Sequence, residues 1–487
     1  MIKKEVNREG WEQIADGLAA KTSTLLGLWA ERECVHICIH DPATGVSVAT
    51  LQTPDKSYPS VARKHLPALR MERAIADLFG LKAEGSPDRR PWLDHGKWPV
   101  RTPFVPVPAS TTPALAYTFL PVEGEGIHQI PVGPIHAGII EPGHFRFSAN
   151  GETVVRLEER LGYVHKGIEK LFEGADLATA AKLAGRISGD STVAYAFAFA
   201  LAAEAALDIK VPPRAQDLRG IMAELERIAN HFGDIGAICN DASFSLMHAH
   251  CGILREETLQ HADACFGHRL MMDRIVPGGV TADLGAAEAV RLLDWTDSAE
   301  KRFDELMQMY EDTASIKNRT NTTGIVSEEL VQLYGAGGYV GRASGRRFDA
   351  RHHAPYPPYD GLEFDIPVLK AGDVNTRLWI RAYEIKQSFI LIRTFVQRLP
   401  QGKIMATLPS PVPSSEGREG MAQVEGFRGD ILVWLRFAGD GRIARCYPRD
   451  PSWFQWPLLE VAVKGNIVAD FPLCNKSFNC SYSGHDL

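Results

Sequence analysis

The chain has 487 residues, of which 45% are hydrophobic and 23% are charged, and its formal net charge is −7. A chain of this length can bury a large core in two or three domains, and the composition is that of an ordinary globular protein. The negative charge disfavours a nucleic-acid partner. The most apolar run, 192–207, is interrupted by Glu204 and is too short to span a bilayer. With no apolar signal core at the N-terminus, we expect a cytoplasmic protein that reaches the inner membrane only through partner subunits.

The eight cysteines are scattered along the chain, and no two of them are spaced as a CxxC pair. In a cytoplasmic protein such cysteines are most often reduced thiols in packed surroundings, which is the state we expect for all eight. They provide no ligand set for an iron–sulfur cluster, so electrons would have to come from another subunit.

Residues 1–85 are predicted to form a small α/β domain. Apolar and polar residues alternate over 35–40, as in a half-buried strand, and 46–51 returns after a turn as the second strand of a hairpin. The helical spacing of apolar residues predicts a helix over 70–81. Residues 86–125 contain many prolines and little periodicity, which predicts an extended linker to the rest of the chain.

Residues 126–487 are predicted to form a mainly helical bundle with small flanking sheets, so the fold class is α+β. This domain opens with strand-like segments over 126–155. It ends with a strand at 431–437, a turn at 439–441 and an irregular tail. Between them, long helical patterns cover 176–207, 213–237, 254–275, 286–316 and 375–399.

A glycine-rich segment, 335–345, lacks the lysine of a phosphate-binding loop, and no clear strand precedes it. A tight loop between helices is the better interpretation. The charged residues in and after it, Arg342, Arg346, Arg347 and Asp349, are then predicted to form a charge network.

Three polar segments are candidates for a functional site. The stretch 133–144 places His136, Glu141 and His144 in a stiff turn region. It is either a structural turn or a place where a glutamate with a raised pKa passes protons. The charged segment 157–170 is interpreted as a solvated face or a subunit contact. In the segment 186–191, Ser188 or Asp190 is predicted to cap the apolar helix that follows.

Several motifs follow one another in a characteristic order, at 133–144, 157–170, 211–216, 277–280, 341–345, 355–365 and 372–377. In this order they resemble the large-subunit family shared by nickel–iron hydrogenases and the quinone-site subunit of complex I. Within it, the chain looks most like the membrane-associated, energy-converting hydrogenases of the formate hydrogenlyase type. The segments 72–81 and 86–90 are similar to the small complex I subunit, which that type carries fused at the N-terminus. The resemblance covers nearly the whole chain.

The family's nickel–iron centre is held by four thiolates, two from an Arg-x-Cys-x-x-Cys motif and two from a C-terminal Cys-x-x-Cys motif. Soft thiolates suit nickel and an iron–carbonyl unit, and neutral hydroxyls do not replace them. Alignment on the resemblance retains Arg186 but puts no cysteine at the four ligand positions, which are Ser188, Ser191, Ser481 and Gly484. The resemblance therefore implies the family's fold without a standard nickel–iron centre and without a metal bound by this chain's cysteines.

The quinone site of the complex I branch is also altered. In that branch a histidine of the 133–144 stretch and a tyrosine near the first cysteine motif hold the quinone headgroup. The same alignment places Ile140 and Gly189 at those two positions. His136 matches only a first histidine that is not a ligand, so Tyr195 and His144 are the nearby polar groups that would have to substitute.

The resemblance implies a subunit of a membrane-associated redox complex and leaves three hypotheses for its role. In the first, the chain docks an iron–sulfur small subunit and couples an event at the altered site to ion translocation by integral-membrane subunits. In the second it reduces a quinone, and in the third it is a scaffold. All three imply a hetero-oligomer with the iron–sulfur cluster on a partner. The predicted site residues are Glu141, His144 and Asp190 for proton traffic, and His136, Arg186, Ser188, Ser191, Tyr195 and Ser481 around a bound group such as a quinone.

Overall fold

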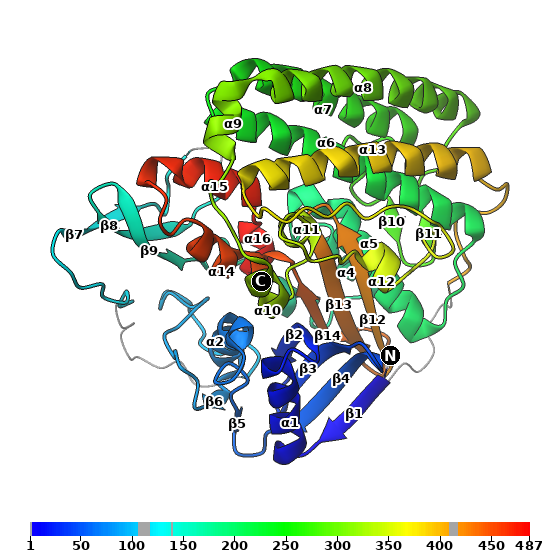
Figure 1. Ribbon diagram of the computed structural model, residues 1–487. Coiled ribbons are helices and arrows are strands. Elements are labelled where there is room, and N and C mark those ends of the chain that lie inside the picture. The colour runs from blue at the N-terminus through cyan, green and yellow to red at the C-terminus, as the bar shows by residue number, and fades with distance from the viewer. Residues whose placement is uncertain (1, 106–116, 138–139, 409–416) are drawn as a thin grey trace.

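The computed structural model describes residues 2–105, 117–137, 140–408 and 417–487. A small N-terminal domain lies against a larger body, which combines two small sheets with a layer of long helices (Figure 1). Two predicted segments fall partly outside the described residues, since 106–116 belongs to the linker and 138–139 to the stretch 133–144.

The N-terminal domain is built on a four-stranded sheet in the order β1-β4-β3-β2. Strand β1 is parallel to β4, and the other neighbours are antiparallel. The predicted hairpin and the predicted helix are confirmed as β3–β4 and α2. The elements are β1 (Ile2–Val6), α1 (Arg8–Ala19), β2 (Thr24–Ala30), β3 (Cys34–Asp41), β4 (Gly45–Gln52), β5 (Ser57–Pro59), α2 (Leu69–Phe79) and β6 (Lys82–Glu84).

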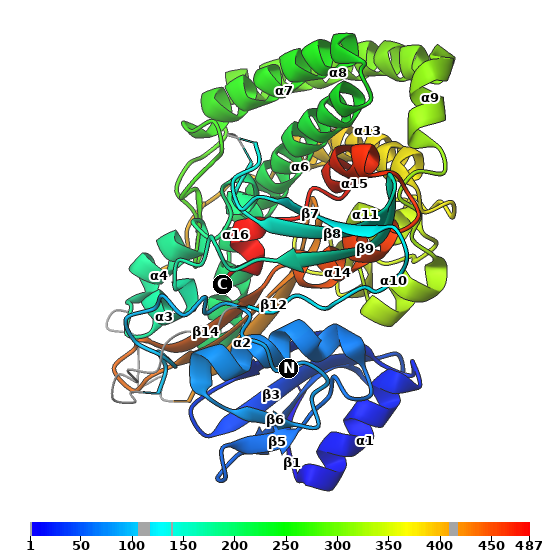
Figure 2. The same ribbon diagram turned by 90° about the vertical axis from the view of Figure 1, so that its left-hand side faces the viewer.

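A three-stranded antiparallel sheet of β7 (Ile127–Val132), β8 (His144–Asn150) and β9 (Thr153–Arg160) opens the larger body (Figure 2). The prediction that 157–170 is a solvated face is wrong for its first half, because β9 continues into it and its carboxylates are buried. Arg70 of α2 pairs with Glu159 at 3.0 Å, and Arg90 of the linker pairs with Glu158 at 2.6 Å. The arginines that neutralise these carboxylates come from the N-terminal region, so the sequence of 157–170 alone does not predict their burial.

Four long helices form a layer on the side away from the N-terminal domain (Figure 1). They are α6 (Pro213–Asp241), α7 (Ser245–Phe266), α8 (Ala286–Asp312) and α13 (Val374–Arg398). Proline at the first position starts α6, as predicted. Helix α7 begins nine residues before its predicted start at 254, because its first turns are largely exposed and carry little apolar pattern. The predicted helix 286–316 breaks at Thr313 and resumes as α9 (Ala314–Thr320).

Short elements connect these helices. The glycine-rich segment 335–345 is partly helical, rather than only a loop. The predicted charge network exists around Arg342, which is buried and pairs with Glu384 at 2.6 Å and Glu425 at 2.9 Å. Arg347, by contrast, is exposed. The short elements are β10 (Ile275–Val276), β11 (Gly279–Val280), α10 (Glu328–Tyr334), α11 (Gly338–Ala343) and α12 (Ala350–His353).

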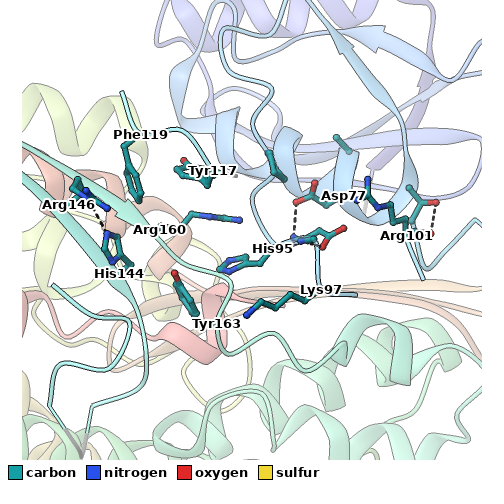
Figure 3. Close-up of a pocket in the computed structure, with 15 residues that line it drawn as sticks. Asp77, His95, Lys97, Arg101, Tyr117, Phe119, His144, Arg146, Arg160 and Tyr163 are labelled. Carbon is teal, nitrogen blue, oxygen red and sulfur yellow. Dashed lines mark hydrogen bonds between the residues drawn. The ribbon is translucent and has the colours of Figure 1, made fainter. Parts of the chain in front are cut away.

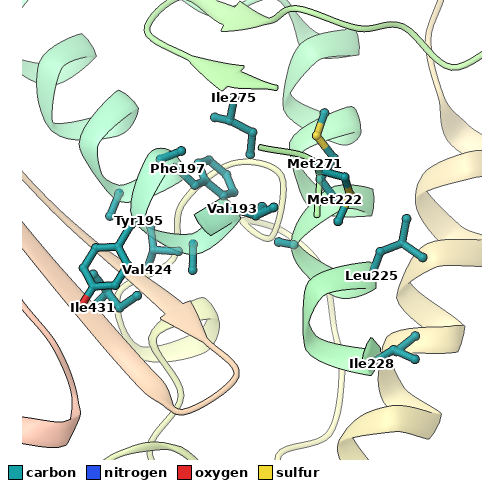
Figure 4. Packing of buried hydrophobic residues seen from close by; sticks show 14 of the residues in the cluster. Val193, Tyr195, Phe197, Met222, Leu225, Ile228, Met271, Ile275, Val424 and Ile431 are labelled. Carbon is teal, nitrogen blue, oxygen red and sulfur yellow. The ribbon is translucent and has the colours of Figure 1, made fainter. Parts of the chain in front are cut away.

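Helix α5 (Thr192–Leu207) lies at the centre of the core, where its side chains pack against α6 and the C-terminal sheet (Figure 4). The predicted continuous helical stretch 176–207 is wrong, because α4 (Leu177–Ala184) ends before a short turn at 189–191. Among the described residues, Gly189–Leu207 is the one stretch long and apolar enough to cross a membrane, and 83% of it is buried within the fold. Burial in the core accounts for its apolar character.

The C-terminal sheet consists of β12 (Glu419–Gly426), β13 (Gly429–Phe437) and β14 (Ile443–Arg449), all antiparallel. One of its faces packs on the N-terminal sheet, where Trp29 stacks on Tyr447 with ring centroids 4.8 Å apart. The prediction of an irregular tail is wrong. It forms α14 (Ser452–Ala462), α15 (Phe471–Phe478) and α16 (Tyr482–His485), all largely buried. The predicted α+β class, with a helical body and small sheets, is confirmed.

Candidate functional site

The four aligned positions meet where the turn before α5 touches the start of α16. The hydroxyls of Ser188 and Ser481 lie 3.0 Å apart and share a hydrogen bond. The backbone N–H of Gly484 donates to Ser481 Oγ at 2.9 Å. Ser188, Ser191 and Ser481 are all buried. The structure thus brings together residues that lie almost 300 positions apart in the sequence, as the resemblance implied.

An ion pair between Asp190 and Arg428 lies at the edge of this group. The guanidinium donates to both carboxylate oxygens, at 2.8 and 2.6 Å, and Ser188 and Ser191 also donate to Asp190, at 2.8 and 3.3 Å. Burial alone would raise the pKa of Asp190, but the charge of Arg428 and these hydrogen bonds hold it below its ordinary value. The Asp190 side chain is 37% exposed and that of Arg428 only 5%, so the ion pair lies at the border between the surface and the buried serines.

Asp450 occupies the space beside Gly484. A Cβ atom at position 484 would lie only 2.3 Å from Asp450 Oδ2. The carboxylate is held in place from two sides, because it accepts hydrogen bonds from the Tyr195 hydroxyl and from the backbone N–H of Ser452. Burial and the adjacent Asp450 charge raise the pKa of Tyr195 well above its ordinary value, so its hydroxyl remains a donor. The fourth ligand position therefore has no room for a longer side chain.

Glu226 of α6 is a site residue that the sequence interpretation missed. Its carboxylate accepts hydrogen bonds from the N–H groups of Val193 at 2.7 Å and Ala194 at 3.0 Å, and so caps α5. Neither Ser188 nor Asp190 caps this helix, which contradicts the predicted cap. Burial raises the pKa of Glu226 to about 8, and the nearby Asp190 charge adds to this effect. No local pattern marks this residue, because its partners lie over 30 positions away.

The other predicted residues lie apart from the serine group. Arg186 points to the surface and pairs with Asp273. Glu141 accepts a hydrogen bond from the backbone N–H of Ser483 at 3.3 Å, which places it against the C-terminal segment. His136 lies against Phe145, with ring centroids 5.5 Å apart, and its buried Nε2 atom has no hydrogen-bond partner among the residues that the structure describes. Burial lowers its pKa.

His144 lines a separate cavity of about 670 Å³ between α2, the linker and the β8–β9 strands (Figure 3). Its ring accepts a hydrogen bond from Arg146 Nε at 3.3 Å. Arg160 and Tyr163 project into the middle of this cavity, and Asp77 lies on the side opposite His144 (Figure 3). The cavity is rich in guanidinium and aromatic groups, and the three serines are not among the residues that line it.

The cysteines near the C-terminus do not restore a thiolate site. Cys474 and Cys480 are buried and unpaired. Burial raises the pKa of Cys474 to about 12 and that of Cys480 well above its ordinary value, so both thiols are neutral near pH 7. The other six cysteines also lack disulfide partners, and all but Cys34 are buried, in agreement with the prediction of packed thiols.

Comparison with known proteins shows which family this chain belongs to. Residues 242–486 match the family described as "Respiratory-chain NADH dehydrogenase, 49 Kd subunit". The chain belongs to this family. Residues 5–109 match "Respiratory-chain NADH dehydrogenase, 30 Kd subunit", so the small N-terminal domain is the 30 kDa-type unit fused to a 49 kDa-type chain. The resemblance proposed from the sequence is confirmed.

Relatives occur on both the hydrogenase and the quinone side of the family. The carbon monoxide-induced hydrogenase of Rhodospirillum rubrum is 32% identical, over 72% of this chain and 97% of its own length. Formate hydrogenlyase subunit 5 of Escherichia coli K12 is 29% identical, over 88% and 77%. An NADH-quinone oxidoreductase subunit from Dehalococcoides mccartyi is 32% identical, over 70% and 92%.

A solved structure shares the fold. A chain of the membrane-bound sulfane sulfur reductase, an archaeal respiratory membrane complex, superposes with a TM-score of 0.70. The match covers 76% of this chain and 100% of the other, at 24% sequence identity. This match shows that the two chains share the same arrangement of helices and sheets.

Glycine at position 484 should be required by the fixed Asp450 carboxylate. Gly484→Ala places a methyl group against a carboxylate that two donors hold, so we expect the free energy of unfolding to fall by about 1–3 kcal/mol. Gly189→Ala is the matched control, because nothing lies within 4 Å of its added Cβ. Chemical denaturation followed by circular dichroism measures both variants. Equal stability of the two would contradict the steric argument.

The raised pKa of Glu226 predicts a pH-dependent stability. The folded chain keeps the Glu226 proton up to a pH of about 8, whereas the unfolded chain releases it near the ordinary value of 4.5. The contribution of Glu226 to the free energy of unfolding is therefore fully present below pH 4.5 and is lost as the pH rises toward 8. Relative to Glu226→Gln, the wild type should lose up to about 1.4 kcal/mol per pH unit in this window.

Denaturation of both proteins across this pH range provides the measurement. The exposed Glu363→Gln is the control and should follow the wild type at every pH. A constant difference between the wild type and Glu226→Gln would show that the carboxyl group does not change its proton affinity on folding.

Proposed function

We propose that this chain is the hydrogenase-like large subunit of a membrane-associated, complex I-related redox complex, and that it works without a nickel–iron centre. In this proposal an electron-transfer event on a partner subunit is coupled through the altered site to ion translocation. The observation that carries the proposal is the Asp190–Arg428 ion pair beside three buried serines, at the positions where thiolates would hold the metals.

The side chains at the four positions support a function without nickel. Serine hydroxyls are poor ligands for nickel and for an iron–carbonyl unit. The hydroxyls of Ser188 and Ser481 form a hydrogen bond with each other. A side chain at position 484 would clash with the Asp450 carboxylate. Buried neutral thiols at Cys474 and Cys480 offer no substitute set. These residues do not fit the family's metal centre.

Charge coupling is the mechanism that the remaining polar groups favour. The Asp190 side chain is partly exposed, and we infer that an iron–sulfur small subunit binds at this part of the surface. An electron arriving on the partner's cluster repels the Asp190 carboxylate and attracts the Arg428 guanidinium, which weakens their ion pair. The proton affinity of Asp190 then rises, and the carboxylate takes up a proton from solvent while the electron stays on the partner's cluster.

Glu226 is the second carboxyl group in this proposed coupling, next to Asp190. It already holds a proton near neutral pH, and the negative charge of Asp190 is one cause. Protonation of Asp190 removes that charge, which lowers the pKa of Glu226 and favours release of its proton. The side chain of Asn230 donates to the backbone carbonyls of both residues, Asp190 and Glu226, at 2.8 Å each, and so ties their backbones together. An electron held on the partner would thus be coupled electrostatically to a shift of protons at the start of α5.

The other roles belong to partner subunits in this proposal. The eight cysteines form no cluster-binding set, so the iron–sulfur cluster lies on the small subunit, and integral-membrane subunits translocate the ion. A quinone or another acceptor is reduced within the same assembly, peripheral to the inner membrane. Direct quinone binding by Tyr195 is not favoured, because its hydroxyl is buried and engaged with Asp450.

The purified multi-subunit complex tests the proposal. We expect nickel far below one atom per chain and no hydrogen uptake. In proteoliposomes supplied with NADH or reduced ferredoxin and a quinone, Asp190→Asn should reduce ion uptake per electron by about tenfold, because it removes the charge that responds to the electron. Asp312→Asn, at the end of α8, is the matched control and should leave uptake unchanged.

Two outcomes contradict the proposal. Stoichiometric nickel with hydrogen turnover would restore the hydrogenase chemistry. Unchanged ion uptake in a fully assembled Asp190→Asn complex would instead make the chain a scaffold. Gel filtration of each complex separates loss of assembly from loss of coupling.

A further inference from the structure

The turn between β2 and β3 brings three potential metal ligands together, far from the site described above. Cys34 and His36 stand two residues apart on β3 and so point to the same side of the strand. Glu31 lies in the turn, closed by a backbone hydrogen bond from its N–H to the Cys34 carbonyl at 2.9 Å. One sulfur, one imidazole nitrogen and one carboxylate oxygen therefore converge, all within 4.8 Å of one another.

Two of the three separations between ligand atoms are close to those around a tetrahedral zinc ion. Cys34 Sγ lies 3.4 Å from His36 Nε2, and the same nitrogen lies 3.2 Å from Glu31 Oε1. Zinc binds sulfur at about 2.3 Å and nitrogen or oxygen at about 2.0–2.2 Å, which places tetrahedral ligand atoms roughly 3.3–3.6 Å apart. The third pair, Glu31 and Cys34, lies within 4.8 Å, and these two side chains would close around the ion.

The surroundings of His36 orient its ring for this role. Its other nitrogen, Nδ1, forms a hydrogen bond with Thr50 Oγ1 at 2.9 Å, as the second nitrogen of a zinc-bound histidine usually does with a neighbouring group. The ring packs against both Trp29 and Trp434, with centroids 5.3 and 5.4 Å away. Nε2 is thereby directed at Glu31 and Cys34.

Access to these groups comes from a cavity of about 630 Å³ that Glu31 and Cys34 help to line. An ion can enter through it, and a water molecule can complete the tetrahedron. The second oxygen of Glu31 pairs with Arg436 of β13, so the site lies at the seam between the N-terminal domain and the C-terminal sheet.

We propose that Glu31, Cys34 and His36 form a zinc site with water as the fourth ligand, which holds the β2–β3 turn together beside the C-terminal sheet. Binding releases the thiol proton of Cys34 to solvent as the zinc–sulfur bond forms. The ion's two positive charges are balanced by one thiolate and one carboxylate. The sequence interpretation treated Cys34 as one more packed thiol, but it is the cysteine that is only half-buried.

Metal binding by the full chain tests this proposal. After chelator treatment and addition of zinc sulfate, we expect one zinc per chain to survive gel filtration. Cys34→Ser and His36→Gln should each lower the retained zinc by roughly tenfold or more. Cys38→Ala and His40→Gln, on the same strand, are matched controls and should keep it.

Cobalt(II) provides a second readout that needs no variant to be stable. The wild-type chain should develop thiolate-to-cobalt charge-transfer absorption, and Cys34→Ser should lose it. Retention of zinc by folded Cys34→Ser or His36→Gln overturns the proposal, as does a wild-type chain that binds cobalt without that absorption. None of these outcomes depends on the redox function proposed above.

Discussion

The nearly complete burial of helix α5 is the constraint on which the rest of this structure depends. All its residues except Leu201 and Ala205 are buried, so it needs neighbours on every side and a partner for the N–H groups at its start. Sheet strands β12 and β13 and helix α6 cover it. Glu226 of α6 satisfies the N–H groups of Val193 and Ala194. The turn that holds Ser188 and Asp190 is fixed in front of this helix as a result.

Buried charges organise the surroundings of that helix. Arg428, Arg342 and Arg219 are each buried and paired with carboxylates, and Arg219 binds Glu204 of α5 at 2.6 Å. Removing one member of such a pair leaves an uncompensated charge in a medium of low polarity, which costs several kcal/mol. The network therefore fixes the relative positions of α5, α6, α13 and the C-terminal sheet more than it adds net stability.

The altered site follows from this rigid frame. The resemblance aligns the thiolate positions of the hydrogenase branch with Ser188, Ser191, Ser481 and Gly484, and the fold brings the turn before α5 and the start of α16 together. Ser188 and Ser481 meet at 3.0 Å because the turn before α5 and the start of α16 are both held by the core. Asp450 fills the space beside Gly484. The arrangement retains a partly exposed carboxylate paired with a buried guanidinium.

The sequence by itself determined the α+β class, the small N-terminal domain, most long helices and the alignment that places Ser188 beside Ser481. The class, the domain and the helices follow from local periodicity, whereas the alignment rests on the resemblance to a family in the order of motifs along the chain. Only the tertiary structure decided that Glu226 caps α5, that Arg70 and Arg90 neutralise the buried carboxylates of β9, and that the C-terminal tail is helical. It also placed Arg186 on the surface and Glu31 next to Cys34 and His36. Such pairings depend on which elements pack together across long sequence separations, and local patterns do not encode the partner of a buried charge.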